Sequence, residues 1–260
     1  MSAARPGTAP NLTVLPHTGL QMAVDLALQL REGTKKSHTM AENTGFVSCF
    51  LKGVVDKASY RTLVADLYFV YAAMEEEIGK LRSASHPVVG PVGFPELNRR
   101  ESLEQDLCFY FGDNWRSAIA ATPAAQEYVA RIHQIAKDAP ELLVGHHYTR
   151  YIGDLSGGQI LKNIAQKAMN LGEHDGLRFY EFDAIPDEKG FKTNYRTTLD
   201  NLPIDQAMAD RIVEEANHAF HLNMKMFQEL EGNLIAAIGK VLFGFLTRRQ
   251  RAGSTEAVAA

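Results

Sequence analysis

A helical stretch that carries three glycines constrains this chain more than any other feature of the sequence. Residues 148–162 read YTRYIGDLSGGQILK, and the spacing of their apolar side chains predicts a helix. Each glycine costs a helix interior about 1 kcal/mol relative to alanine. Gly153 and Gly157 are four residues apart, so together they leave one face of the helix bare. Arg150 and Asp154 have the same spacing and meet on a neighbouring face.

A bare helix face beside a guanidinium and a carboxylate has two explanations. It suits a large planar ligand with polar chemistry at its centre. It equally suits close packing against a second helix, which is a common reason for glycine inside a helix. The spacing alone does not decide between them.

Helical periodicity extends along almost the whole chain of 260 residues. The nearest candidate for a strand, residues 179–182, is too short to build a sheet. Pro and Gly separate the predicted helical runs, which are 22–43, 59–83, 101–111, 123–136, 140–170, 187–199 and 204–246. With no internal repeat and no linker, the sequence predicts one all-α domain.

The chain ends are expected to lie outside this domain. We predict a disordered extension over residues 1–22, the folded domain over 23–246 and a disordered tail over 247–260. The apolar stretch 234–246 is too short to span a bilayer, so we expect no transmembrane segment. It could pack on the body or touch a membrane surface.

Composition excludes several classes of function. A hydrophobic content of 45% with 22% charged residues is typical of a soluble globular protein. The net charge of −4 argues against a nucleic-acid partner. Two distant cysteines, Cys49 and Cys108, form no disulfide framework or zinc spacing, which favours a reducing compartment.

A second polar stripe lies on the first predicted helix. Helical spacing places four side chains on one face, namely Arg31, Lys35, His38 and Glu42. Imidazole is a common ligand of iron, and a carboxylate one turn away can orient it. The alternative is a solvated charged face with an incidental histidine.

Three further groups could complete such a site. Lys192 and Arg196 form a basic pair four residues apart, suited to binding carboxylates. Helical spacing also aligns Phe220, Asn223 and Phe227. Tyr71 and Glu75 form an i, i+4 pair in an apolar helix, where the hydroxyl needs a polar partner. Each group has a structural alternative, namely a solvated face or ordinary core packing.

A di-iron carboxylate bundle is the rival reading. Such a site needs two Glu-x-x-His motifs, and this chain has only the one at 215–218. No phosphate-binding loop, dinucleotide-binding turn, nucleophile elbow or His-Glu-x-x-His motif is present either.

Taken together, these stretches resemble the haem oxygenase family, closely its cyanobacterial and algal-plastid type, over about residues 23–250. The motifs that carry the resemblance are EGTKKSHTMAEN at 32–43, FPEL at 94–97, LEQDL at 103–107, the 148–162 segment and 223–231. The resemblance implies a single all-α domain that holds haem between a proximal and a kinked distal helix.

The resemblance also implies a role for each candidate residue. His38 would be the iron ligand, with Glu42 as its partner. The three distal glycines, Gly153, Gly157 and Gly158, would let the distal helix lie on the porphyrin. The expected propionate contacts are Lys35, Tyr148, Lys192 and Arg196, with Arg31 as a weaker candidate. Phe220, Asn223 and Phe227 would line the pocket, and Tyr71, Arg150 and Asp154 would hold ordered water above the iron.

The implied reaction is the oxidative cleavage of haem b, both cofactor and substrate, to biliverdin (expected as the IXα isomer), CO and ferrous iron. It consumes O₂ and electrons, which must come from a partner because we find no flavin or nicotinamide motif; the resemblance to the cyanobacterial type implies that this partner is ferredoxin. A bilin reductase could act downstream. We expect a monomer in the cytoplasm, with the plastid stroma as the alternative. A haem carrier or sensor without turnover is the competing function, although the retained Asp154 and distal glycines favour the enzyme.

Overall fold

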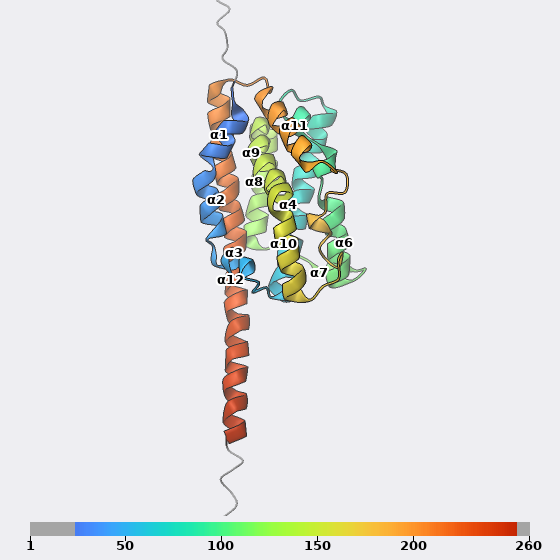
Figure 1. The fold of residues 1–260 in the computed structure, drawn as a ribbon. Helices are drawn as coiled ribbons and strands as arrows, with labels where there is room; N and C mark the ends of the chain where they lie inside the picture. Colours follow the sequence, from blue (N-terminus) through green and yellow to red (C-terminus); the bar gives the residue numbers. More distant parts are fainter. Residues whose placement is uncertain (1–23, 254–260) are drawn as a thin grey trace, which may run out of the picture.

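The structure, a computed structural model, describes residues 24–253, and the side chains of 24–231. The predicted extension 1–22 and residues 254–260 lie outside the described residues. Within the described part every regular element is a helix, so the all-α prediction is confirmed (Figure 1).

Twelve α-helices and four shorter helical turns follow one another along this part of the chain. The α-helices are α1 (Leu26–Gly33), α2 (Lys35–Glu42), α3 (Gly45–Leu51), α4 (Lys57–Ser83), α5 (Val89–Val92), α6 (Arg100–Phe111), α7 (Trp115–Ala118), α8 (Pro123–Asp138), α9 (Leu143–His147), α10 (Gly153–Met169), α11 (Glu188–Asp200) and α12 (Gln206–Gly253). The 3₁₀ turns are η1 (Pro95–Leu97), η2 (Pro140–Leu142) and η4 (Arg178–Tyr180), and η3 (Tyr148–Ile152) is a π-helical turn.

Two predicted runs are helical but interrupted. The first divides into α1 and α2 at Thr34, whose hydroxyl donates to the Leu30 carbonyl at 2.7 Å. Such a side-chain bond competes with regular helix geometry. The run 140–170 contains a 3₁₀ turn, α9, the π turn and α10 in succession. The predicted boundaries are therefore sound, but the continuity within them is not.

Other differences concern short or terminal elements. Sequence periodicity missed α3, α5 and α7, because helices of seven and four residues span too few turns to show a pattern. The strand candidate at 179–182 overlaps the 3₁₀ turn η4. Helix α12 continues to Gly253 and so overlaps the start of the predicted tail 247–260.

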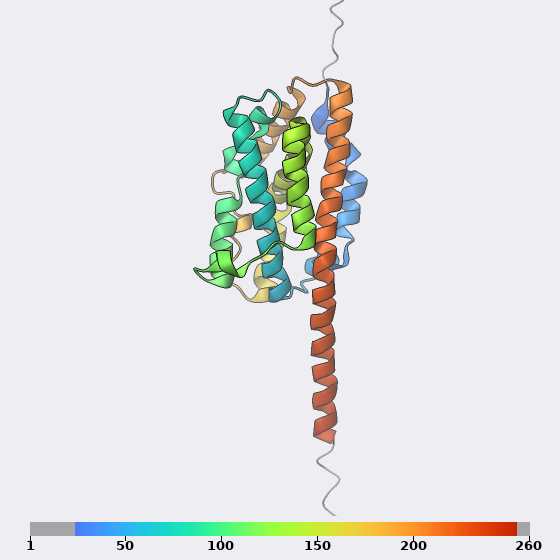
Figure 2. The ribbon, with the colours of Figure 1, turned by 180° about the vertical axis from the view of Figure 1, so that it is seen from behind.

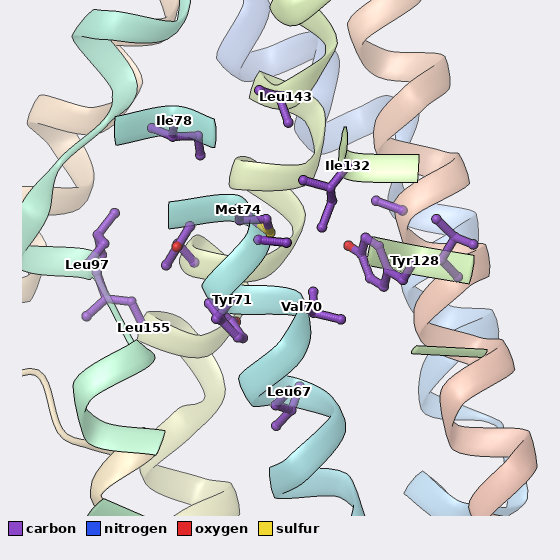
Figure 3. Packing of buried hydrophobic residues seen from close by; sticks show 14 of the residues in the cluster. Leu67, Val70, Tyr71, Met74, Ile78, Leu97, Tyr128, Ile132, Leu143 and Leu155 are labelled. Atoms are coloured by element: carbon purple, nitrogen blue, oxygen red, sulfur yellow. The ribbon is translucent and has the colours of Figure 1, made fainter. Parts of the chain in front are cut away.

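The core is built around α4, which packs against α6, α8 and α12. Its apolar residues recur at helical spacing and are fully or almost fully buried, as for Leu67, Val70 and Met74. Figure 3 shows this face of α4 with Leu97 and Leu155 on one side and Tyr128 and Ile132 on the other. Each fully buried side chain of this size contributes about 1.5–3 kcal/mol to the burial term.

The candidate site lies between the elements that flank this core. Helices α1, α2 and α3 pack along α12, and Figure 1 shows α10 and α11 on the adjoining side. Seen from behind, α8 is in front and α12 continues past the rest of the domain (Figure 2). No helix among the described residues is long and apolar enough to cross a membrane.

A buried polar network joins α8, α9 and α12. Glu215 accepts hydrogen bonds from Arg131 Nη2 at 2.5 Å and from His146 Nε2 at 2.8 Å. Burial alone would raise the pKa of Glu215, but these two donors lower it from 4.5 to about 2. Glu215 on α12 therefore links α8 and α9 to α12 by hydrogen bonds.

This network predicts how stability responds to acid. Because the pKa of Glu215 is depressed in the folded state, its contribution is complete above pH 4.5 and is lost as the pH falls through about 2. A shift of this size corresponds to roughly 3 kcal/mol. We expect Glu215→Gln to lower the free energy of unfolding in urea at pH 7 and to flatten its acid dependence.

The matched control is Glu127→Gln. Glu127 pairs with Lys225 at 2.7 Å on the surface, where the Glu127 side chain is 49% exposed, so its removal should change stability little. Equal effects of the two substitutions would contradict the assignment to Glu215.

Candidate active site

The distal segment begins with the π turn η3 and continues into α10. An added Cβ at Gly153 or Gly157 would meet no atom within 4 Å, so both glycines border open space. At Gly158 the Tyr180 ring lies at 3.5 Å, an ordinary contact. By contrast, a Cβ at Gly145 would stand 2.7 Å from the Ile212 carbonyl oxygen. Helix packing thus accounts for Gly145, but not for the bare stripe.

Helix α2 carries the candidate iron ligand. The side chain of His38 is 58% exposed, and its Nδ1 lies 3.7 Å from a Glu42 carboxylate oxygen. The edge of one ring meets the face of the other between His38 and Phe220, with centroids 5.8 Å apart. The predicted pairing of His38 with Glu42 is therefore present at ion-pair distance, and Phe220 steadies the imidazole ring.

A cavity of about 400 Å³ lies among α1, η3, α10 and α11, and it is basic on balance because its lining has three cations against the carboxylates of Asp25 and Asp200. Its lining includes Arg31, Tyr148, Ile152, Ser156, Lys192 and Arg196. Arg31, expected to be the weaker propionate contact, lies in this lining. Lys35 does not; it is 71% exposed and pairs with Glu32 at 3.1 Å. Arg31 thus lies at the cavity and Lys35 outside its lining, and both remain predicted propionate contacts.

A hydrogen-bonded chain connects the polar residues of the distal side. The Asp154 carboxylate accepts a bond from the Tyr71 hydroxyl. That hydroxyl in turn accepts from Arg150 Nε at 3.1 Å, and Arg150 Nη1 donates to Asn223 at 2.7 Å. Arg150 also lies 3.7 Å from Asp154. Burial raises the pKa of Asp154 well above its ordinary value, which favours a carboxyl group that can hold a proton.

The predicted pair of Tyr71 and Glu75 is wrong. Tyr71 turns to Asp154, whereas Glu75 accepts the backbone N–H groups of Arg99 at 2.5 Å and Arg100 at 3.0 Å. Glu75 therefore anchors the start of α6. The first N–H groups of a helix have no partner within the helix, and a carboxylate satisfies them well. Glu75 therefore bonds these N–H groups and not the Tyr71 hydroxyl.

The predicted stripe on α12 contributes to both sides of the site. Phe220 meets His38, Asn223 joins the arginine network, and Phe227 stacks on Phe46 with centroids 5.9 Å apart. Phe46 was not anticipated, because α3 has no recognisable period.

The rival di-iron reading fails in the described part of the chain. Glu215 faces Arg131 and His146, and no group of three His, Cys, Asp or Glu residues could hold a metal ion there. A single imidazole such as His38 suits an iron that its own macrocycle already ligates.

Sequence reasoning also missed Asp106, Phe179 and Tyr180 behind the distal helix. One signal was available for Asp106. It shares a helix face with Leu103 and Leu107, both completely buried, and a carboxylate on an apolar face is informative.

Comparison with known proteins agrees with this geometry. The family model described as "Heme oxygenase" matches residues 24–229. The chain belongs to the haem oxygenase family. Members of this family are enzymes that degrade haem, and the fold described above is the haem oxygenase fold.

Several relatives cover nearly the whole chain. "Heme oxygenase 1" of Synechocystis sp. is 65% identical over 90% of this chain and 97% of its own length. "Heme oxygenase" of Rhodella violacea is 54% identical, covering 86% and 94%. The crystal structure of the Synechocystis heme oxygenase-1 in complex with heme superposes with a TM-score of 0.83, at 64% identity, covering 86% of this chain and all of that one.

The glycines offer a direct test of the open stripe. Gly153→Ala and Gly157→Ala should each raise the stability of the haem-free protein by up to about 1 kcal/mol, because helix propensity improves and nothing is displaced. Gly153→Leu should also leave the haem-free fold intact while sharply weakening haem binding. Urea unfolding and Soret titration measure the two effects.

Gly145→Ala is the control, because its Cβ would collide with the backbone of α12 and should destabilise the fold. Unfolding of the haem-free Gly153 variants, with unchanged haem affinity in the folded fraction, would instead indicate a packing role.

Proposed function

We propose that this chain cleaves haem b to biliverdin, CO and ferrous iron, using O₂ and electrons from reduced ferredoxin. The open glycine stripe of α10 carries the proposal, since it leaves room for a planar ring beside the Asp154 network. The relatives from Synechocystis and Rhodella support the same reaction and a cytoplasmic or plastid setting. We further propose a monomer whose product passes to a bilin reductase.

The residues present fit the haem group. His38 offers an exposed imidazole on α2, oriented by Glu42. The cations Arg31, Lys192 and Arg196 line one cavity and match two propionates. When bound, the haem iron would supply oxygen activation while the ring itself is oxidised.

The distal residues would control protons and water. Tyr71 and Arg150 orient the Asp154 carboxyl group, and burial raises its pKa well above its ordinary value, which favours the protonated form. Asp154 can then position a water that delivers this proton. Gly153 and Gly157 have no side chain beyond hydrogen, so the ring could lie close to the backbone of α10, which would restrict the edge of the ring that reacts. We propose that biliverdin IXα is the product.

Turnover distinguishes the enzyme from a haem carrier with the same fold. Haem added to the protein would give a Soret band in either case. With reductant and air, growth of biliverdin absorbance supports the enzyme, and a static Soret band supports the carrier.

The iron ligand is tested by His38→Ala. The variant should lose the spectrum of histidine-ligated haem and most turnover, because Ala offers no nitrogen donor. External imidazole should partly restore both by occupying the vacated space. His218→Ala and His221→Ala serve as controls and should behave like the parent. Parent-like activity of His38→Ala would refute the assignment.

The proton-handling role is tested by Asp154→Ala. Haem should still bind, because His38 and the basic cavity provide that affinity. Biliverdin formation should fail, because no proton is positioned. Asp154→Asn should be milder if positioning of water matters more than charge. A normal biliverdin yield from Asp154→Ala would refute the role, whatever its haem affinity.

Electron delivery requires a surface for an acidic partner. Lys36 and Lys167 are exposed on α2 and α10 and remain candidates for it. Lys162, expected to share this role, is 13% exposed and pairs with Glu181 at 2.7 Å. It therefore stabilises the fold, and charge reversal there would not test docking.

Salt and charge reversal test the docking proposal. Ferredoxin-supported turnover should fall steeply between low and moderate salt, because screening acts within about 8 Å at physiological ionic strength. Turnover with ascorbate should change little. Lys167→Glu should weaken only the ferredoxin reaction, whereas Lys137→Glu, at an exposed position of α8, should not. Equal salt dependence with both reductants would remove the docking claim.

A further inference from the structure

Residues 176–182, between α10 and α11, pack behind the distal helix α10. The Tyr180 ring lies against Gly158, and its hydroxyl is 3.3 Å from that of Tyr60. The edge of Phe179 meets Tyr71, with ring centroids 5.6 Å apart. The segment therefore supports both α10 and the tyrosine that bonds Asp154.

A buried carboxylate on α6 holds this segment in place. Asp106 is 1% exposed and accepts the backbone N–H groups of Arg178 and Phe179, each at 2.8 Å. Both carboxylate oxygens are used, one for each N–H. An isolated buried charge would be costly, and these two charge-assisted bonds offset that cost.

Arg99 fastens the same segment from its other end. Its Nη1 donates to the carbonyl oxygens of Phe179, at 3.4 Å, and of Glu181. The guanidinium lies 3.8 Å from the centre of the Phe182 ring. Lys162 on α10 reaches the Glu181 carboxylate at 2.7 Å, which ties the segment to the distal helix itself.

We propose that Asp106 is a positioning residue for the distal site, acting through the Phe179–Tyr180 backbone on Tyr71 and on the face of α10. Asp106 touches neither the bare glycine stripe nor Asp154. It sets where the 3₁₀ turn η4 stands, and that turn limits how far α10 and Tyr71 can move. The haem readouts below rest on the proposed function, whereas the haem-free readout does not.

The chain contains a matched control for a purely structural role. Asp66 on α4 is also buried, and it accepts bonds from the Thr122 backbone N–H and hydroxyl, both at 2.9 Å. Burial raises the pKa of both carboxyl groups, to about 7 for Asp106 and about 6 for Asp66. Asp66 secures the start of α8, away from α10.

The experiment compares Asp106→Asn with Asp66→Asn. Asparagine has one acceptor oxygen and one NH₂ group. Asp106→Asn turns that NH₂ towards a backbone N–H and loses one bond, whereas Asp66→Asn can donate it to the Thr122 hydroxyl, so the stability of each variant is measured in urea alongside the readouts below. In the haem-free chain, Asp106→Asn should speed amide hydrogen exchange in residues 153–158 and 178–182 by about tenfold or more, as expected when local opening becomes about 1.4 kcal/mol easier. Asp66→Asn should leave those amides protected.

The ferric haem complex gives a second readout. Asp106→Asn should shift the pH of its acid–alkaline spectral transition, because a displaced Tyr71 changes the polarity above the iron, and Asp66→Asn should not. If Asp106→Asn does not fold, Arg99→Lys loosens the same segment and should give the same two shifts.

The positioning role would be overturned if Asp106→Asn, or Arg99→Lys in its place, left amide exchange in residues 153–158 unchanged. It would also be overturned if Asp66→Asn changed that exchange as much as Asp106→Asn does. A parent protein that binds no haem would refute the proposed function and leave the exchange result standing.

Discussion

The hydrogen-bonded chain from Asn223 through Arg150 and Tyr71 to Asp154 is the interaction on which the rest of the structure depends. It draws on α12, the π turn, α4 and α10, which are the elements that also build the core. An arginine that is 8% exposed is tolerated only where its donors are satisfied, so these helices must meet in one arrangement. The arrangement that satisfies Arg150 also presents Asp154 to the open stripe.

Stability and function make opposite demands on α10. Glycine weakens the helix, and open space at Gly153 and Gly157 yields no packing in return. Contacts on the other side of the helix offset this loss of stability. Tyr180 packs on Gly158. The Glu181 carboxylate forms ion pairs with Lys162, His174 and Arg178. One side of α10 is therefore held firmly by charge and aromatic contacts, while the other is left bare for a ring.

Much of the fold could be predicted because apolar residues recur at helical spacing over several turns of each long amphipathic helix. Helix α4 was located within two residues at its start, where Asp56 caps it through the Ser59 N–H. Short α3 could not be found, because its seven residues GFVSCFL are almost uniformly apolar. The π turn was equally hidden, since its residues keep a helical pattern while the hydrogen bonding changes.

The sequence by itself determined which side chains share a helix face: the bare stripe at Gly153 and Gly157, and the pairing of His38 with Glu42. Tertiary structure decided the partners of groups on different helices. The Tyr71 hydroxyl bonds Asp154, 83 residues away, and not Glu75 on its own helix. Lys162 forms an ion pair with Glu181. Helical period describes one segment at a time, whereas the partner of a buried polar group depends on which segments pack against it, because burial without a partner is too costly.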